Sequence, residues 1–146
     1  MNYKIELKMK FGNDDNDRIP SMELMKERFD KFSEGKQGVL IYHESFKDYS
    51  YDISGIGYDQ VDKLGVIGTI QTTEIIDDTF YLNAELNKEI NLDENHICFF
   101  RAHMKTSMDS TNTAFDMVDV FAVDLIRILD NEPINKVNLS KIEKCN

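Results

Sequence analysis

The stretch LGVIGTIQTTEIIDDTFYLNAEL, residues 64–86, contains two β-rich runs that meet at Asp77 and Asp78. Two such runs separated by a pair of turn-forming residues are typical of a β-hairpin. In the second run, apolar residues from Phe80 to Leu86 alternate with polar ones, which predicts a strand with one buried face. We start the prediction of the fold from this hairpin.

Three further segments have strand character. Residues 3–11 alternate apolar and mostly charged side chains with a period of two, and the lysines on the polar side are typical of an exposed sheet edge. Residues 39–42 and 97–104 are short apolar runs that predict two more strands. The polar region 44–63 between them predicts a long irregular or hairpin-like connection.

Residues 21–35 predict an amphipathic helix. Ser21 is a suitable N-cap, and Gly35 is a suitable stop. Apolar residues recur between them at helical spacing and form one stripe, made of Met22, Leu24, Met25, Phe29 and Phe32. We expect this stripe to pack on one face of the sheet.

The run AFDMVDVFAVDLIRIL, residues 114–129, fits two structures. Its β-branched residues favour a strand, whereas its charged residues gather on one side of a helical wheel. These charged residues are Asp116, Asp119, Asp124 and Arg127. The grouping favours a helix capped by Thr113, and a bulged strand is the alternative.

Together these segments predict an α+β fold, with a mainly antiparallel sheet of about five strands and one or two helices packed on one face. The length of 146 residues suits one globular domain, residues 1–146. We expect the polar tail 131–146 to be mobile or to serve in docking.

The charge pattern disfavours direct nucleic-acid binding. The chain has 27 acidic and 17 basic residues, and residues 106–126 contain Asp109, Asp116, Asp119 and Asp124 but no Lys or Arg. Phosphate binding depends on Lys and Arg, so a surface of this sign repels nucleic acids. No apolar run approaches the roughly 18 residues of a membrane span, and no secretory signal is recognised, so we expect a cytoplasmic protein without a membrane partner.

The sequence contains no constellation that indicates chemistry. His96, Cys98 and His103 are metal-ligand types, but on a strand His103 faces away from the other two. We therefore expect no catalytic residue, no metal site and no cofactor. The best interaction candidates are Tyr49, Tyr51 and Tyr58, each next to an aspartate, because tyrosine is favoured at interfaces. Packing of these rings onto the sheet is the alternative.

We predict a non-enzymatic interaction or assembly protein that binds a protein partner or a second copy of itself. The preference for Asn, Asp, Ile and Lys suggests a phage accessory or virion-associated component, found in the host cytoplasm or in the virion. One alternative is an acidic inhibitor that mimics nucleic acid on a host enzyme through Asp109, Asp116 and Asp119. Another is a small hydrolase or nuclease that uses His43, His96 or His103.

Overall fold

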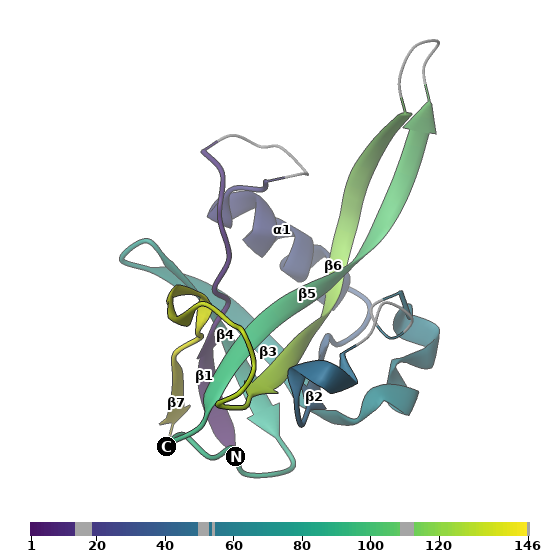
Figure 1. The fold of residues 1–146 in the computed structure, drawn as a ribbon. Helices are drawn as coiled ribbons and strands as arrows, with labels where there is room; N and C mark the ends of the chain where they lie inside the picture. Colours follow the sequence, from purple (N-terminus) through teal and green to yellow (C-terminus); the bar gives the residue numbers. More distant parts are fainter. Residues whose placement is uncertain (14–18, 50–52, 54, 109–112, 146) are drawn as a thin grey trace.

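The computed structural model describes residues 1–13, 19–49, 53, 55–108 and 113–145. Their strands form one seven-stranded mixed sheet, and α1 packs against it (Figure 1). The strands are β1 (Asn2–Glu6), β2 (Val39–His43), β3 (Val66–Ile76), β4 (Thr79–Leu86), β5 (Asn95–Met108), β6 (Thr113–Ile128) and β7 (Ile142–Cys145). The helices are α1 (Met22–Ser33) and the short 3₁₀ helices η1 (Phe46–Asp48), η2 (Tyr58–Leu64) and η3 (Lys136–Asn138).

The predicted α+β class is confirmed, but the sheet is larger and less regular than expected. The strand order is β5-β6-β2-β3-β4-β1-β7, and β2 and β6 run parallel while the other neighbours are antiparallel. The sheet is mainly antiparallel, as predicted, but it has seven strands instead of about five, and one neighbouring pair is parallel. Parallel pairing joins strands far apart in the chain, and no local sequence signal marks it.

The hairpin predicted at residues 64–86 is confirmed. β3 and β4 pair from Ile76 opposite Thr79 to Gly68 opposite Leu86. Asp77 and Asp78 form the turn with φ angles of 47° and 60°. Positive φ at both central residues is the geometry of a type I′ turn, which matches the twist of the two strands.

The predicted helix is also confirmed. The Ser21 side chain accepts a hydrogen bond from the Leu24 N–H at 3.1 Å, which satisfies one of the free donors at the start of α1. Met25 and Phe29 enter the main core, and Phe32 enters a second cluster with Phe121. The helix therefore contributes side chains to both apolar clusters of the molecule.

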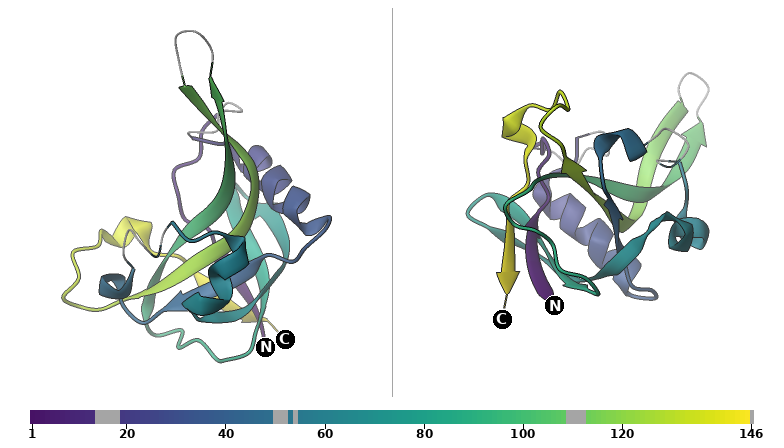
Figure 2. Two further views of the ribbon diagram at one scale, coloured as in Figure 1. Left: turned by 90° about the vertical axis from the view of Figure 1, so that its right-hand side faces the viewer. Right: turned by 60° about the horizontal axis from the view of Figure 1, so that its bottom comes forward.

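The edge strand predicted at residues 3–11 needs two corrections. β1 ends at Glu6, and it lies between β4 and β7 instead of at an edge (Figure 2). The Nζ atom of Lys4 lies 2.9 Å from Oε1 of Glu74. Lys4 therefore contributes an ion pair on the surface of the sheet. The sequence pattern did not reveal that β7 covers the edge of β1.

The helix predicted at residues 114–129 is wrong, because this segment is strand β6. The alternative, a bulged strand, is correct: the pairing with β5 skips Val118 and Phe121. Each extra residue shifts the alternation of faces, so the inward positions include Met117, Val120 and Val123, three residues apart. The two bulges thus gave the inward residues a spacing close to that of a helix.

The sheet curls around its core until its two ends approach each other. Ser140, just before β7, donates from its N–H to the His96 carbonyl of β5 at 2.8 Å. The next residue, Lys141, accepts a bond at 2.8 Å from the Glu6 N–H of β1. Part of the tail 131–146 thus lies across the seam between β5 and β1.

Candidate functional site

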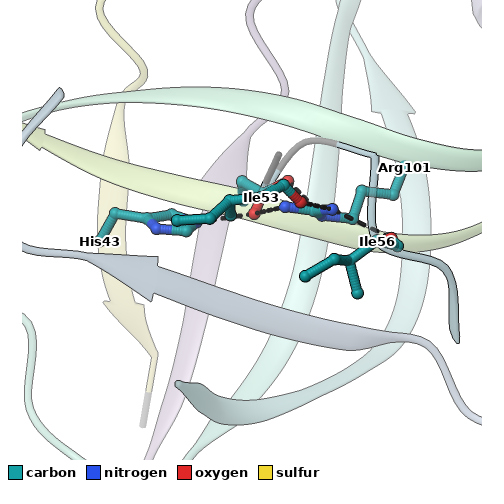
Figure 3. Close-up of polar contacts among 5 residues, drawn as sticks. His43, Ile53, Ile56 and Arg101 are labelled. Carbon is teal, nitrogen blue, oxygen red and sulfur yellow. Dashed lines mark hydrogen bonds and ion pairs between the residues drawn. The ribbon is translucent and has the colours of Figure 1, made fainter. Parts of the chain in front are cut away.

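A buried polar cluster lies on the outer face of β2, β5 and β6, beneath the connection that follows β2 (Figure 3). Asp124 of β6 is 0% exposed, and His43 and Arg101 are buried beside it. Arg101 donates to Asp124 through Nε at 2.8 Å and through Nη2 at 3.0 Å, and His43 Nε2 lies 2.7 Å from Oδ1. Parallel pairing of β2 with β6 brings His43 next to this carboxylate.

The cluster also fixes the covering connection. Arg101 Nη1 donates to the carbonyl oxygens of Ile53 at 2.6 Å and of Ile56 at 3.1 Å, as Figure 3 shows. A buried charge requires an opposite charge beside it and hydrogen bonds to its polar atoms, and Asp124 has both. With its oxygens occupied and no exposed surface, this carboxylate has a structural role.

The predicted interaction tyrosines lie on this connection. The Tyr49 ring stands edge-on to His43 and stacks on Phe99, both at 5.3 Å between centroids. Burial and the Asp124 charge raise the pKa of Tyr49. Tyr58 packs against Phe32 at 5.0 Å, and Tyr51 lies outside the described residues. The rings of Tyr49 and Tyr58 therefore pack against other side chains of this protein. The role of the predicted tyrosines in an interface stays a prediction.

The predicted acidic surface is less uniform than the sequence indicates. Asp116 is exposed, Asp119 Oδ1 lies 2.7 Å from His103 Nδ1, and Asp124 belongs to the buried cluster. Asp109 lies outside the described residues. A mimic of nucleic acid needs free, regularly spaced charges, and two of these four carboxylates are engaged within the protein.

The His103–Asp119 pair stands beside an open recess of about 360 Å³. His103 is 43% exposed at its side chain and stacks on Phe121 at 4.4 Å. Hydrogen bonding of Nδ1 to the carboxylate leaves Nε2 available as a base. None of the described residues that line the recess has a hydroxyl or thiol group, so these residues offer the histidine no nucleophile of the protein to activate.

A larger groove of about 510 Å³ lies next to this recess, along the first half of β5. Residues 97–100 of β5 form one side, and residues 7–9 and 133–135 contribute to the other. Burial raises the pKa of the Cys98 thiol in this groove to about 12, which excludes it as a nucleophile at neutral pH. No sequence motif indicated the groove, because it is assembled from four distant segments, residues 7–9, 46, 97–100 and 133–138.

The β5–β6 arm, residues 105–108 and 113–116, is the second feature that the sequence did not reveal. β5 and β6 pair as far as Met108 opposite Thr113, but β2 pairs with β6 only from Ala122 onward. The outer part of the two strands therefore projects beyond the sheet as a ribbon (Figure 1). Met104, at the base of this arm, is 50% exposed.

Potential metal ligands do not gather in the part of the chain that the structure describes. No group of three or more His, Cys, Asp and Glu side chains there could hold a metal ion. Cys98 belongs to the inner core, whereas His103 pairs with Asp119 on the outer face. Among the same residues, no helix is long and apolar enough to cross a membrane.

Comparison with known proteins adds no assignment to this geometry. No protein-family model matches the sequence, and the searches of curated proteins and of solved structures found no match. The interpretation of the site therefore depends on the contacts described above.

Proposed function

We propose that this protein is a non-enzymatic assembly protein that binds another protein through the β5–β6 arm. The observation that supports this proposal is the ribbon beyond the Met104–Met117 pair, past the last core residue of β6, where β2 no longer pairs with β6. A two-stranded ribbon is at best marginally stable alone in water, and an open strand edge favours pairing with another chain. A partner surface would stabilise both.

The chemistry of the molecule also favours binding over catalysis. Asp124 and its partners Arg101 and His43 are buried, and both partners contact the Asp124 carboxylate. Cys98 is protonated at neutral pH, because burial raises its pKa to about 12. These groups lack the exposed nucleophile and base that covalent catalysis requires.

Shortening the arm tests the proposal. Met104 lies opposite Met117, so replacing residues 105–116 with Asn-Gly closes the hairpin with a two-residue turn. Light scattering and cross-linking in extracts of the native source should show a complex for the full chain and none for the short-arm variant. Thermal unfolding followed by circular dichroism checks that the variant still folds. An equal yield of complex from both proteins contradicts the proposal, as does a full chain that is only a monomer.

The identity of the partner is part of the proposal. The residue usage that favours Asn, Asp, Ile and Lys supports a phage accessory or virion component, and the net charge of −10 disfavours self-association. Genes for head, tail or assembly proteins beside this one would support a phage partner. A neighbourhood of unrelated metabolic genes would argue against it.

The His103–Asp119 pair supports a second candidate function, a hydrolase that activates water. The 2.7 Å contact orients the imidazole, and the exposed ring borders the recess. Hydrolysis of bis(p-nitrophenyl) phosphate that disappears in His103→Gln but persists in His96→Gln would support this function. Absence of turnover in the wild-type protein would exclude it for phosphodiesters.

A further inference from the structure

The two hollows described above together follow one continuous strand edge. Ile97, Cys98, Phe99 and Phe100 line the groove, and the five residues from Phe100 to Met104 line the recess. Successive residues of a strand point to opposite faces of a sheet. A hollow that touches all of them in turn must therefore run along the edge of β5 and not over one face.

The backbone of β5 faces this edge at alternate residues. The bond from Ser140 N–H to the His96 carbonyl shows that His96 directs its backbone groups away from β6. In an antiparallel strand this direction repeats every second residue, so the N–H and C=O groups of Cys98, Phe100 and Ala102 also point outward. Within the described ranges, β6 is the only strand that pairs with β5.

The walls of the hollows define the chemistry of an occupant. The side chains on both sides of the groove are mainly apolar and include Met9, Phe46 and Ile134. The exposed basic residue of the linings is Lys8 in the groove, whereas Arg101 and His103 of the recess are already paired with Asp124 and Asp119. Among the described residues, neither lining includes Asp or Glu, although 27 of the 146 residues of the chain are acidic. The edge therefore suits an apolar segment with negative charge.

We propose that the edge of β5 from Ile97 to Met104 binds an extended, acidic segment of a partner protein by strand addition. The backbone of the segment pairs with Cys98, Phe100 and Ala102. Its alternate apolar side chains enter the groove, and a carboxylate lies near Lys8. This inference rests on the proposed function and names a second contact with the partner, at the base of the arm.

Synthetic peptides test the strand addition. The probes are nine-residue peptides with one central glutamate and with threonine alternating with valine, leucine, isoleucine or phenylalanine. Each is N-methylated at alternate amides, in two versions. In one version, the methyl groups lie on the edge opposite the N–H of the glutamate, so the edge with this N–H can pair. In the other version, the methyl groups lie on the same edge as this N–H, so this edge cannot pair. Methylation of either edge also prevents stacking of the peptides on one another.

Amide signals of Cys98, Phe100 and Ala102 in the labelled full-length protein give the readout. We expect one version of at least one peptide to shift these signals and to slow their hydrogen exchange, and the other version of the same peptide to bind at least tenfold more weakly. Equal binding of the two versions overturns strand addition. So does a panel in which no peptide shifts these signals at about 1 mM, the concentration that reveals even weak binding. Pairing of β5 with a second copy, seen as a dimer in sedimentation without peptide, would also overturn it.

Matched variants separate the charge and the apolar walls. Lys8→Glu should weaken binding about fivefold, while Lys31→Glu, on the exposed face of α1, should leave it unchanged. Ile134→Asp should weaken binding about tenfold or more, while Leu92→Asp, 48% exposed and outside the groove, should not. Unchanged affinity in both groove variants overturns the site.

The short-arm variant separates this inference from the proposed function. It keeps residues 97–104, so it should bind the peptide as the full chain does. A complex that depends on the arm, together with no peptide binding, would leave the proposed function standing and refute the groove. Peptide binding without any arm-dependent complex would support the groove and refute the proposed function.

Discussion

Asp124 is the residue on which the buried cluster depends. It accepts hydrogen bonds from Arg101 and His43, and Arg101 in turn holds the carbonyl groups of Ile53 and Ile56. The sequence placed Asp124 among surface charges, because no local pattern distinguishes a buried aspartate from an exposed one. Its burial follows from pairing with strands β5 and β2, which contribute Arg101 and His43 from 23 and 81 residues away.

We therefore predict that Asp124→Ala destabilises the protein by about 3–5 kcal/mol, because it leaves the Arg101 charge buried without a counter-ion. Urea unfolding at neutral pH measures this loss. The matched control is Asp116→Ala, an exposed residue on the same strand, which should change the free energy of unfolding by no more than about 0.5 kcal/mol. A loss below about 1 kcal/mol for Asp124→Ala would contradict the structural role of the cluster.

His96 predicts a pH dependence of stability. Its ring is 1% exposed, and among the described residues its Nε2 has no hydrogen-bond partner. Burial lowers the pKa of His96 from the usual 6.5, and the nearby charge of Glu94 offsets only part of this shift, while Arg127 and Lys88 add to it. The unfolded chain therefore binds the proton at a higher pH than the folded one.

It follows that the folded state loses stability as the pH falls below about 6.5 towards the folded pKa, and that the loss levels off below that value. In His96→Phe this contribution should disappear, and the aromatic contact with Tyr42 should be kept. Urea unfolding of both proteins at about pH 7.5 and about pH 5 measures the difference, at about 1.4 kcal/mol for each unit of pKa shift. Equal pH dependence in the two proteins would show that His96 makes no contribution.

At the level of elements, sequence patterns predicted α1 and the β3–β4 hairpin because both are local. The cap of Ser21 and the turn at Asp77 and Asp78 depend on residues within a few positions of each other. The pattern failed for β6, where two bulges moved inward residues to a spacing of three. A bulge is set by the partner strand, so the segment alone could not distinguish it from a helix. The groove along β5 was not predictable for the same reason, since its walls come from distant segments.

For the β3–β4 turn we predict a change that stabilises the protein, whereas the predictions above concern losses of stability. Asp77 and Asp78 both have positive φ angles, and Asn-Gly is the preferred pair for such a turn. The double variant Asp77→Asn, Asp78→Gly should stabilise the protein by about 0.5–1 kcal/mol, because glycine accepts this conformation without steric cost. Asp78→Ala should instead cost about 1 kcal/mol. Thermal unfolding of the three proteins gives the order, and a double variant less stable than wild type would contradict the turn type.

At the scale of the whole molecule, the two ends of the sheet meet through the C-terminal segment. β7 pairs with β1, and Ser140 and Lys141 connect β5 to β1 across the seam. The sequence indicated only a polar tail, because β7 has four residues and little apolar character. Closure of this kind depends on contacts between the last residues and the first ones, and it becomes visible only when the sheet is assembled. It also decides where the open edge of β5 begins.

Removal of residues 136–146 tests this closure. The truncation deletes β7 and the bonds of Ser140 and Lys141, including the one from the Lys141 N–H to the Glu6 carboxylate at 3.2 Å. At about 1 kcal/mol for each hydrogen bond, less the chain entropy regained, we expect a loss of about 2–4 kcal/mol and faster amide exchange in β1. Removal of Cys145 and Asn146 alone should have a much smaller effect, because Ser140 and Lys141 stay in place. If the long truncation unfolds at the same urea concentration as the full chain, the C-terminal segment does not close the sheet in solution, and the start of the free β5 edge moves from Ile97 to the beginning of the strand.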